Sequence, residues 1–254
     1  MSDYRTENCH LFGHPEIVLP FTGAPPDPLW LLQTLEEMVA SGSVFKHGQA
    51  VEICGGTCKI HGRENGDMEL RQPDMTIIPI QWIPGMDQPV RMAVLQMHVC
   101  RLLGSPLEYV RLDQAVQISA AALAGATSFT MSRETPNGRV AGWTITAAED
   151  DTSALQLMSV FEAIAMLPKI VAFLALSPPA TARMHTDGRL EAMHGDKTAD
   201  SDTDEFLHRI ASVVWEPVKI HFSRPAGTGT GGEAEAQRPK WWTTGIVKLR
   251  KLLS

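Results

Sequence analysis

The chain has 254 residues, of which 44% are hydrophobic and 20% charged, so it can bury a sizeable core and is not disordered overall. Its net charge is −7, and no apolar run approaches the roughly 18 residues that a membrane-spanning helix needs. The start, MSDYRTENCH, lacks the basic cap and apolar stretch of a secretory signal, so we expect a cytoplasmic protein with reduced cysteines.

The charge is unevenly distributed along the chain. Five of the 22 Lys and Arg residues lie in residues 238–254, which hold no Asp or Glu. The remaining 17 stand against 29 acidic residues, so residues 1–237 carry a net charge of −12. A body with this charge repels nucleic acid and attracts basic proteins. We therefore expect a protein partner and no binding of DNA or RNA.

The first half of the chain predicts short strands, one clear helix and one further short helix. Apolar residues recur at intervals of three and four across residues 28–40, which is typical of an amphipathic helix. Ser105 and Pro106 indicate the start of a further short helix. Short apolar runs bounded by turn residues predict strands at 17–21, 50–53, 75–82 and 90–99.

The composition changes near residue 115, where a second unit is predicted to begin. Pro136, Asn137 and Gly138 suit a tight turn, because proline presets φ and glycine accepts positive φ. Pro168 is expected to kink or break a helix over 155–176. The other predictions are strands at 116–119, 128–133 and 140–147, a strand–turn–strand over 181–193, a surface loop at 196–204, a helix at 205–215 and a strand at 218–222.

These elements predict an α+β fold: two small units of mainly antiparallel strands with packed helices, followed by a flexible linker and a basic tail. We expect the tail to dock on the acidic body, because docking satisfies both its charges and its apolar residues. The predicted parts are 1–112, 113–195, a helix–strand extension at 196–222, the flexible linker at 223–237 and the basic amphipathic tail at 238–254.

Two cysteines and two histidines lie close together in the sequence. Cys54 and Cys58 stand between His47 and His61, and zinc prefers four ligands of these types. Histidines in structural zinc fingers, however, come paired three to five residues apart, and the stretch CGGTCKIHGRENGD is typical of a turn-rich loop. The sequence therefore favours loop thiols, and we predict no metal and no cofactor.

No enzyme signature stands out. The sequence contains neither G-x-S-x-G nor H-E-x-x-H, so we predict no catalytic residues. Glu149, Asp150 and Asp151 are compatible with metal binding or acid–base chemistry. Carboxylates that precede a predicted helix are more typical of capping, because they favour the positive end of the helix dipole.

Residues 14–110 resemble the later part of a bacterial suppressor-of-fused-like domain. The apolar stretch HPEIVLPF leads to a helix, after which Gly42, Phe45 and Gly48 match the G-x-x-F-x-x-G element of that family. The chain lacks the front portion of the family and has only a short connection after His98. This resemblance implies a protein-binding module.

Residues 115–190 resemble a short immunity-protein domain of bacterial polymorphic toxin systems. The signature includes a strand end with a serine and a short helix, an f-M-x-R-E strand, and a strand with Gly142 and Trp143. An acidic step at Glu149 and Asp150 and an apolar helix leading to P-x-I follow. The chain departs at Ala141, where the family commonly has a serine or an acid.

The two resemblances imply a toxin-neutralising immunity protein of interbacterial competition, which binds a cognate toxin and blocks it. The acidic body suits a basic, nuclease-type toxin. Glu149, Asp150, Asp151 and Trp143 are the predicted partner contacts, with solvated caps and a core tryptophan as the alternatives. The alternative functions are a cytosolic adaptor that sequesters a non-toxin protein and a zinc-dependent enzyme. The sequence does not indicate an oligomeric state.

Overall fold

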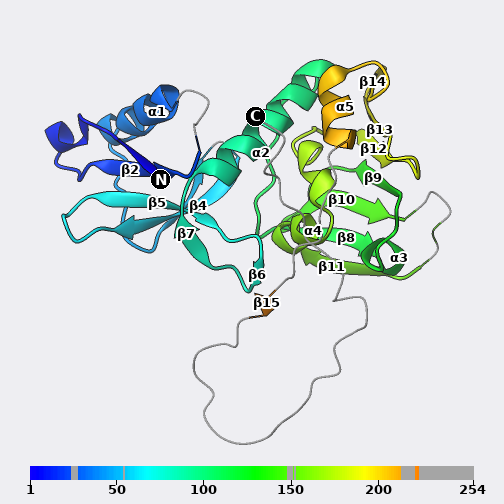
Figure 1. Cartoon of the computed structure of the whole chain (residues 1–254), viewed down its shortest axis with the longest axis horizontal. Helices are drawn as coiled ribbons and strands as arrows, with labels where there is room; N and C mark the ends of the chain where they lie inside the picture. Colours follow the sequence, from blue (N-terminus) through cyan, green and yellow to red (C-terminus); the bar gives the residue numbers. More distant parts are fainter. Residues whose placement is uncertain (24–27, 54, 148–150, 152, 213–220, 223–254) are drawn as a thin grey trace, which may run out of the picture. The chain divides into compact units, whose positions relative to one another are not determined.

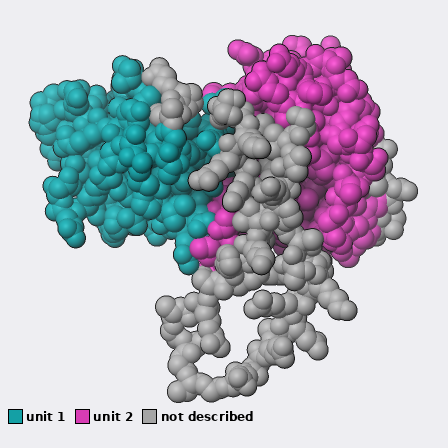
Figure 2. Space-filling model, viewed as in Figure 1, with its two compact units in different colours: residues 1–74, 80–94 teal, residues 75–79, 95–254 magenta. Residues whose placement is uncertain are grey.

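The computed structural model describes residues 1–23, 28–53, 55–147, 151, 153–212 and 221–222. As predicted, the fold is α+β (Figure 1). The chain forms two compact units, which Figure 2 shows in different colours. Unit 1 comprises residues 1–74 and 80–94, and unit 2 comprises residues 75–79 and those from 95 onward.

Unit 1 is built on a six-stranded sheet. Its elements are β1 (Ser2–Arg5), η1 (Cys9–Phe12), β2 (Ile17–Phe21), α1 (Leu29–Ala40), β3 (Ala50–Ile53), β4 (Gly56–Gly62), β5 (Met68–Pro73) and β7 (Trp82–Pro84). The strand order is β1-β2-β5-β4-β3, with β7 also paired to β5. Only β2 and β5 are parallel, and the other pairs are antiparallel. The predicted strands at 17–21 and 50–53 and the helix at 28–40 are confirmed.

The core of unit 1 joins α1 to the sheet. Leu31, Leu35 and Val39 recur every four residues along α1 and are buried, which is the pattern of a helix with one apolar face. All five residues of β2 are buried as well, and the same core includes Ile17, Leu19 and Phe21.

The structure explains why each named residue of the G-x-x-F-x-x-G element after α1 is a glycine or a phenylalanine. Gly42 and Gly48 have φ of 96° and 82°, in the region that favours glycine. Phe45 is buried between them, and its backbone N–H donates to His14 Nε2 at 3.0 Å. The His14 and Phe45 rings also meet edge to face, with centroids 5.7 Å apart. The element therefore fastens the turn after α1 to the residues before β2.

Residues 90–99, predicted as a strand, instead lie inside the 17-residue helix α2 (Asp87–Leu103). Asp87 and Pro89 occupy its first turn, where a carboxylate and a residue without an N–H are favourable. Residues 87–94 of α2 belong to unit 1 and residues 95–103 to unit 2. The main part of unit 2 therefore begins at residue 95, while the parts 1–112 and 113–195 stay predictions from the sequence.

Unit 2 is built on a seven-stranded sheet. Its elements are β6 (Ile77–Ile78), β8 (Ala115–Ser119), α3 (Ala120–Leu123), β9 (Phe129–Arg133), β10 (Val140–Thr146), β11 (Leu155–Ser159), α4 (Val160–Met166), η2 (Pro168–Ala172), β12 (Ala180–Met184), β13 (Leu190–His194), β14 (Lys197–Asp200), α5 (Glu205–Ser212) and β15 (His221–Phe222). The strand order is β11-β8-β10-β9-β12-β13-β14. Within this seven-stranded sheet β8 and β10 are parallel, and the other neighbouring strands are antiparallel. The predicted hairpins β9–β10 and β12–β13 are confirmed.

Three predictions in this unit are wrong, two of them in part. The predicted helix 155–176 begins as strand β11, and α4 starts only at Val160. Ser159 marks the change, because its hydroxyl accepts from the Glu162 N–H at 3.1 Å while the Glu162 carboxylate accepts from the Ser159 N–H at 2.9 Å, forming a capping box. The predicted loop 196–204 contains strand β14, which pairs with β13. The short helix predicted to begin at Ser105 and Pro106 is wrong outright, because residues 104–114 contain no helix.

Residues 75–82, predicted as one strand, are divided between the units. β6 lies in unit 2 and pairs in parallel with β15, whereas β7 lies in unit 1. Of the predicted strand 218–222, only residues 221–222 are among the described residues. The predicted linker 223–237 and tail 238–254 lie outside them. None of the described helices is both long and apolar enough to cross a membrane.

Candidate functional site

The two faces of the unit 2 sheet differ in burial. On one face the alternate side chains of β8, β9, β10, β12 and β13 are buried, and they include Val116, Ile118, Met131, Trp143, Ile145, Ala182, Leu190 and Ala192. The other face, which we call the open face, has Ser119 buried at the end of β8, but its remaining side chains are exposed or half-buried and most are polar: Gln117, Thr130, Ser132, Thr144, Thr181, Arg183, Glu191, Met193 and Thr198. The open face is therefore the surface of this sheet that a partner can reach.

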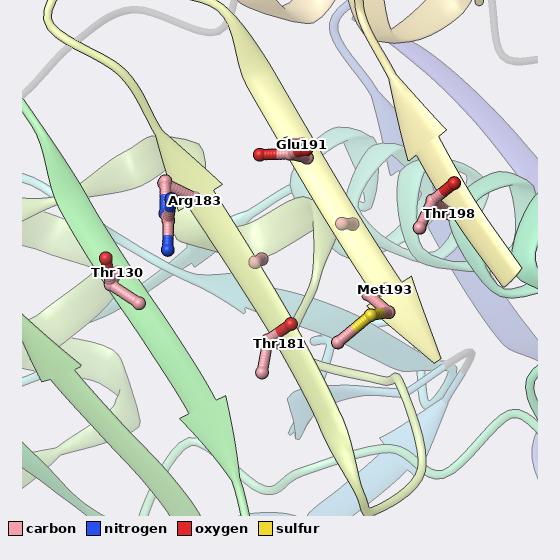
Figure 3. Close-up of a pocket in the computed structure, with 8 residues that line it drawn as sticks. Thr130, Thr181, Arg183, Glu191, Met193 and Thr198 are labelled. Atoms are coloured by element: carbon pink, nitrogen blue, oxygen red, sulfur yellow. The ribbon is translucent and has the colours of Figure 1, made fainter. Parts of the chain in front are cut away.

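The open face is hollowed over β9, β12, β13 and β14 (Figure 3). The hollow has a volume of about 330 Å³ and is lined by Thr130, Thr181, Ala182, Arg183, Glu191, Ala192, Met193 and Thr198. Strand register places Arg183 directly opposite Glu191 on β13 and opposite Thr130 on β9. Because the hollow lies on a sheet surface and carries charges of both signs, it suits a polar side chain of a protein partner.

Ionisable side chains gather at the β12–β13 turn, next to this hollow. His185 Nε2 lies 3.1 Å from Glu191 Oε2 and 3.2 Å from Arg189 Nη2. Arg189 Nη1 donates to Asp200 Oδ2 at 2.5 Å, and its Nε lies 3.9 Å from Asp202 Oδ2. A cation surrounded by carboxylates at one edge of the open face can complement a mixed-charge surface on a partner.

Trp143, one of the predicted partner contacts, is fully buried, with 0% of its surface exposed. Its indole Nε1–H donates to the Leu174 carbonyl at 3.1 Å, and its ring lies 5.7 Å from Arg133 Cζ. The structure therefore places Trp143 in the core, where it holds β10 against the segment after η2, and gives it no surface to present to a partner.

Arg133 is part of the same arrangement, and its side chain is only 1% exposed. Its Nη1 donates to the carbonyls of Glu108, Leu174 and Leu176. Burial lowers the pKa of the guanidinium, while the Glu108 carboxylate, 3.4 Å from Nη2, opposes that effect. Arg133 therefore serves as a structural donor that satisfies carbonyls far apart in the sequence.

Gly142 completes this structural set. Its φ is +83°, and a Cβ atom added there would lie 2.1 Å from the Glu134 carbonyl oxygen. The two backbones approach so closely because the Glu134 N–H donates to the Gly142 carbonyl at 3.0 Å. The register of β10 against β8 also shifts between Val140 and Thr144, on either side of this glycine. The sequence signature around Gly142 and Trp143 thus has a structural explanation.

Asp151 is built into the turn between β10 and β11. Its two carboxylate oxygens accept from the backbone N–H groups of Ala147 at 3.0 Å and Ser153 at 2.9 Å. Hydrogen bonds from the hydroxyls of Ser119 and Ser153 and from these backbone groups hold the pKa of Asp151 well below its usual range. The expected capping of a helix is corrected, because the element that follows is strand β11. Residues 149–150 lie outside the described residues.

The four candidate metal ligands are not brought together as far as they are described. His47 and His61 are neighbours, with ring centroids 5.0 Å apart, and His47 Nδ1 accepts from the Gly62 N–H. Cys58 is buried on the other face of β4, where its Sγ lies 3.7 Å from the sulfur of Met86. Cys54 lies outside the described residues, and among those described no three His, Cys, Asp or Glu side chains are grouped to hold a metal ion.

In a comparison with known protein families, part of unit 2 matches one family model. Residues 95–193 match the Imm33-like domain. This is a family of immunity proteins. The match begins at the residue where the main part of unit 2 begins and ends within β13. No curated protein and no solved structure matches the chain.

The Imm33-like region contains both the structural signature and most of the hollow. Arg133, Gly142 and Trp143 lie within it, as does every residue that lines the hollow except Thr198. Strand β14, which carries Thr198, extends the sheet beyond the match. The candidate site is therefore a surface of the Imm33-like sheet that one further strand enlarges.

Sequence reasoning missed Arg183 and Glu191, although a signal was present. On each of the paired strands β12 and β13 a buried alanine stands between two residues of the open face: Ala182 between Thr181 and Arg183, and Ala192 between Glu191 and Met193. This alternation indicates a sheet with one buried and one accessible face. It predicts which residues share a face, but their convergence on one hollow depends on strand order.

Proposed function

We propose that this chain is an immunity protein that neutralises a bacterial protein toxin by binding it, without a catalytic step of its own. The observation that carries this proposal is the Imm33-like domain at residues 95–193. A stable sheet with an accessible polar face is a suitable scaffold for such binding, because affinity comes from a few well-placed contacts on a rigid surface.

Coexpression tests the proposal. The toxin-like product of the adjacent gene is expressed in a sensitive bacterium, with and without this chain. We expect death when it is expressed alone and survival when the chain is present. Equal killing in both cultures, with the chain well expressed, would overturn the proposal. So would a stable complex with a harmless protein from the native cell, which is the outcome expected of an adaptor.

We further propose that the toxin contacts the open face of the unit 2 sheet. The hollow beside Arg183 and Glu191 supports this choice. Thr181→Arg places a long charged side chain in the hollow and is expected to weaken toxin binding at least tenfold, measured by titration calorimetry. Thr135→Arg makes the same change at an exposed position after β9 and should leave binding unchanged. Equal effects of the two variants would rule out this face.

The acidic body supports a basic toxin, such as a nuclease, and residues 149–151 remain candidate contacts. Glu149→Lys with Asp150→Lys is the appropriate charge reversal, because Asp151 holds its turn together and its loss would confuse folding with binding. We expect this double variant to slow toxin association at low salt. An unchanged association rate would remove these two residues from the interface.

We also propose that unit 1 is a suppressor-of-fused-like module. The support is local: Gly42 and Gly48 have positive φ, and Phe45 is buried between them and bonded to His14. Superposition of unit 1 on a suppressor-of-fused domain tests this proposal by strand order. A sheet order in unit 1 that differs from that of the suppressor-of-fused family would overturn it.

A further inference from the structure

We propose that strand β11 is an edge through which two copies of this chain pair their unit 2 sheets. β11 is the terminal strand of the seven-stranded sheet and pairs with β8 on one side. Within the described part of the chain, no strand pairs with its other side. An unpaired strand edge offers backbone donors and acceptors that another strand can satisfy.

The ladder with β8 determines which backbone groups point outward. Its two ends are marked by the hydrogen bonds Ala120 N–H to Ala154 carbonyl and Val160 N–H to Gln114 carbonyl. Hydrogen-bonded pairs alternate in an antiparallel ladder, so Gln156 and Met158 direct their backbone groups to β8. The N–H and carbonyl groups of the residues between them, Leu155 and Leu157, therefore point away from the sheet.

The protein's own side chains close both ends of this outer edge. The Ser159 N–H donates to the Glu162 carboxylate at 2.9 Å, and the Ser153 N–H donates to Asp151 at 2.9 Å. The edge that remains consists of Leu155 and Leu157. It is short, and its limits are sharply defined.

The side chains of these two residues are apolar and exposed. Leu155 is 49% and Leu157 65% exposed, and both lie on the open face opposite Ser119 and Gln117. Residues 153–159 contain no charged residue and no proline, which are the usual means of protecting an edge strand. A net charge of −7 opposes the approach of a second copy, and residues 153–159 add no charge of their own to that repulsion.

A second copy fits this edge because the edge is complementary to itself. A two-fold axis at Gln156 places Leu155 of one copy opposite Leu157 of the other, and the reverse. Both pairs then occupy hydrogen-bonded positions, so four backbone hydrogen bonds form and four leucines pack on one face. The two Gln156 residues meet each other on the opposite face. An isologous contact of this kind closes after two copies, as a dimer.

Disulfide trapping tests this register. In the two-fold arrangement the two Gln156 Cα atoms form a non-hydrogen-bonded pair about 4.5 Å apart, which a disulfide can bridge. The full chain with Cys54→Ser provides the background, since Cys9, Cys58 and Cys100 are buried. Under mild oxidation we expect Gln156→Cys to form a covalent dimer and Leu155→Cys to stay monomeric. Failure of Gln156→Cys to cross-link, or equal cross-linking by both variants, would overturn the proposal.

Charge substitution provides an independent test in solution. Leu157→Asp is expected to weaken the dimer at least tenfold in dissociation constant, measured by sedimentation equilibrium. Leu11→Asp changes an equally exposed leucine (67%) in unit 1 and should leave the dimer unchanged, and circular dichroism checks that both variants fold. A wild-type chain that stays monomeric up to about 100 μM, or equal dimers in both variants, would overturn the proposal. Neither result depends on a toxin, so the outcome of this test is independent of the proposed function.

Discussion

At Gly142 the surrounding backbone leaves no room for a side chain. Gly142→Ala combines a positive φ with a Cβ atom 2.1 Å from the Glu134 oxygen. We expect the free energy of unfolding of unit 2 to fall by about 3 kcal/mol, measured by urea denaturation. Gly188 has a similar φ, +88°, with nothing within 4 Å of the added Cβ, so Gly188→Ala should cost only about 1 kcal/mol. Equal losses would show that the close approach is unimportant.

Arg133 is the residue whose hydrogen bonds are hardest to replace. Arg133→Lys keeps a positive charge but loses the planar fork that bonds the carbonyls of Glu108, Leu174 and Leu176. Buried carbonyls left without donors are costly, so we expect a loss of about 3 kcal/mol in the free energy of unfolding. Arg139→Lys makes the same change at an exposed position and should stay within about 0.5 kcal/mol of the wild type.

Between β10 and β11, the turn depends on one ionised carboxylate. The pKa of Asp151 is lowered in the folded chain, so its charged form stabilises the fold above about pH 4, the ordinary value for the unfolded chain. This contribution declines as the pH falls below that value. We expect Asp151→Asn to melt at a lower temperature than the wild type at pH 6, with the difference shrinking toward pH 3. A difference that is constant with pH would contradict the assignment.

The elements that sequence reasoning predicted well have one clear period or a diagnostic turn. Helix α1 shows a single apolar stripe, and the β9–β10 hairpin has Pro136 and Gly138 in its turn. Helix α2 was predicted as a strand because apolar residues also occupy its exposed positions, such as Met97 and Leu102, which blurs the helical period. Strand β11 was absorbed into a helix because its short apolar run continues directly into α4.

The candidate site was harder to predict than the fold. Trp143 was predicted to contact a partner because it is a large aromatic residue. Its packing against Arg133 and its hydrogen bond to the Leu174 carbonyl show that its role is in the core. Arg183 and Glu191 lie on neighbouring strands and look ordinary in the sequence. Their significance depends on the order of β9, β12, β13 and β14, which long-range pairing decides and local patterns do not.

At the scale of the whole molecule, net charge affects the approach of a partner before any contact forms, because electrostatic forces have the longest range. Deletion of residues 238–254 changes the net charge from −7 to −12. If the toxin is basic, as proposed, the shortened chain should associate with it several-fold faster at about 50 mM salt, and the two rates should converge at about 500 mM. Stopped-flow fluorescence measures both rates. Equal rates at low salt would show that net charge does not steer the encounter.

The pairing of β6 with β15 has a consequence for how the protein is made. Ile77 and Ile78 are translated long before His221 and Phe222, their partners in the parallel pair. While the ribosome is still working, the sheet of unit 1 and the seven strands of the larger sheet can assemble in order, since all of them are encoded between residues 2 and 200. The β6 segment stays without its partner strand until residues 221–222 have been translated. Its pairing is a later event in biosynthesis, possible only once those two residues have been made.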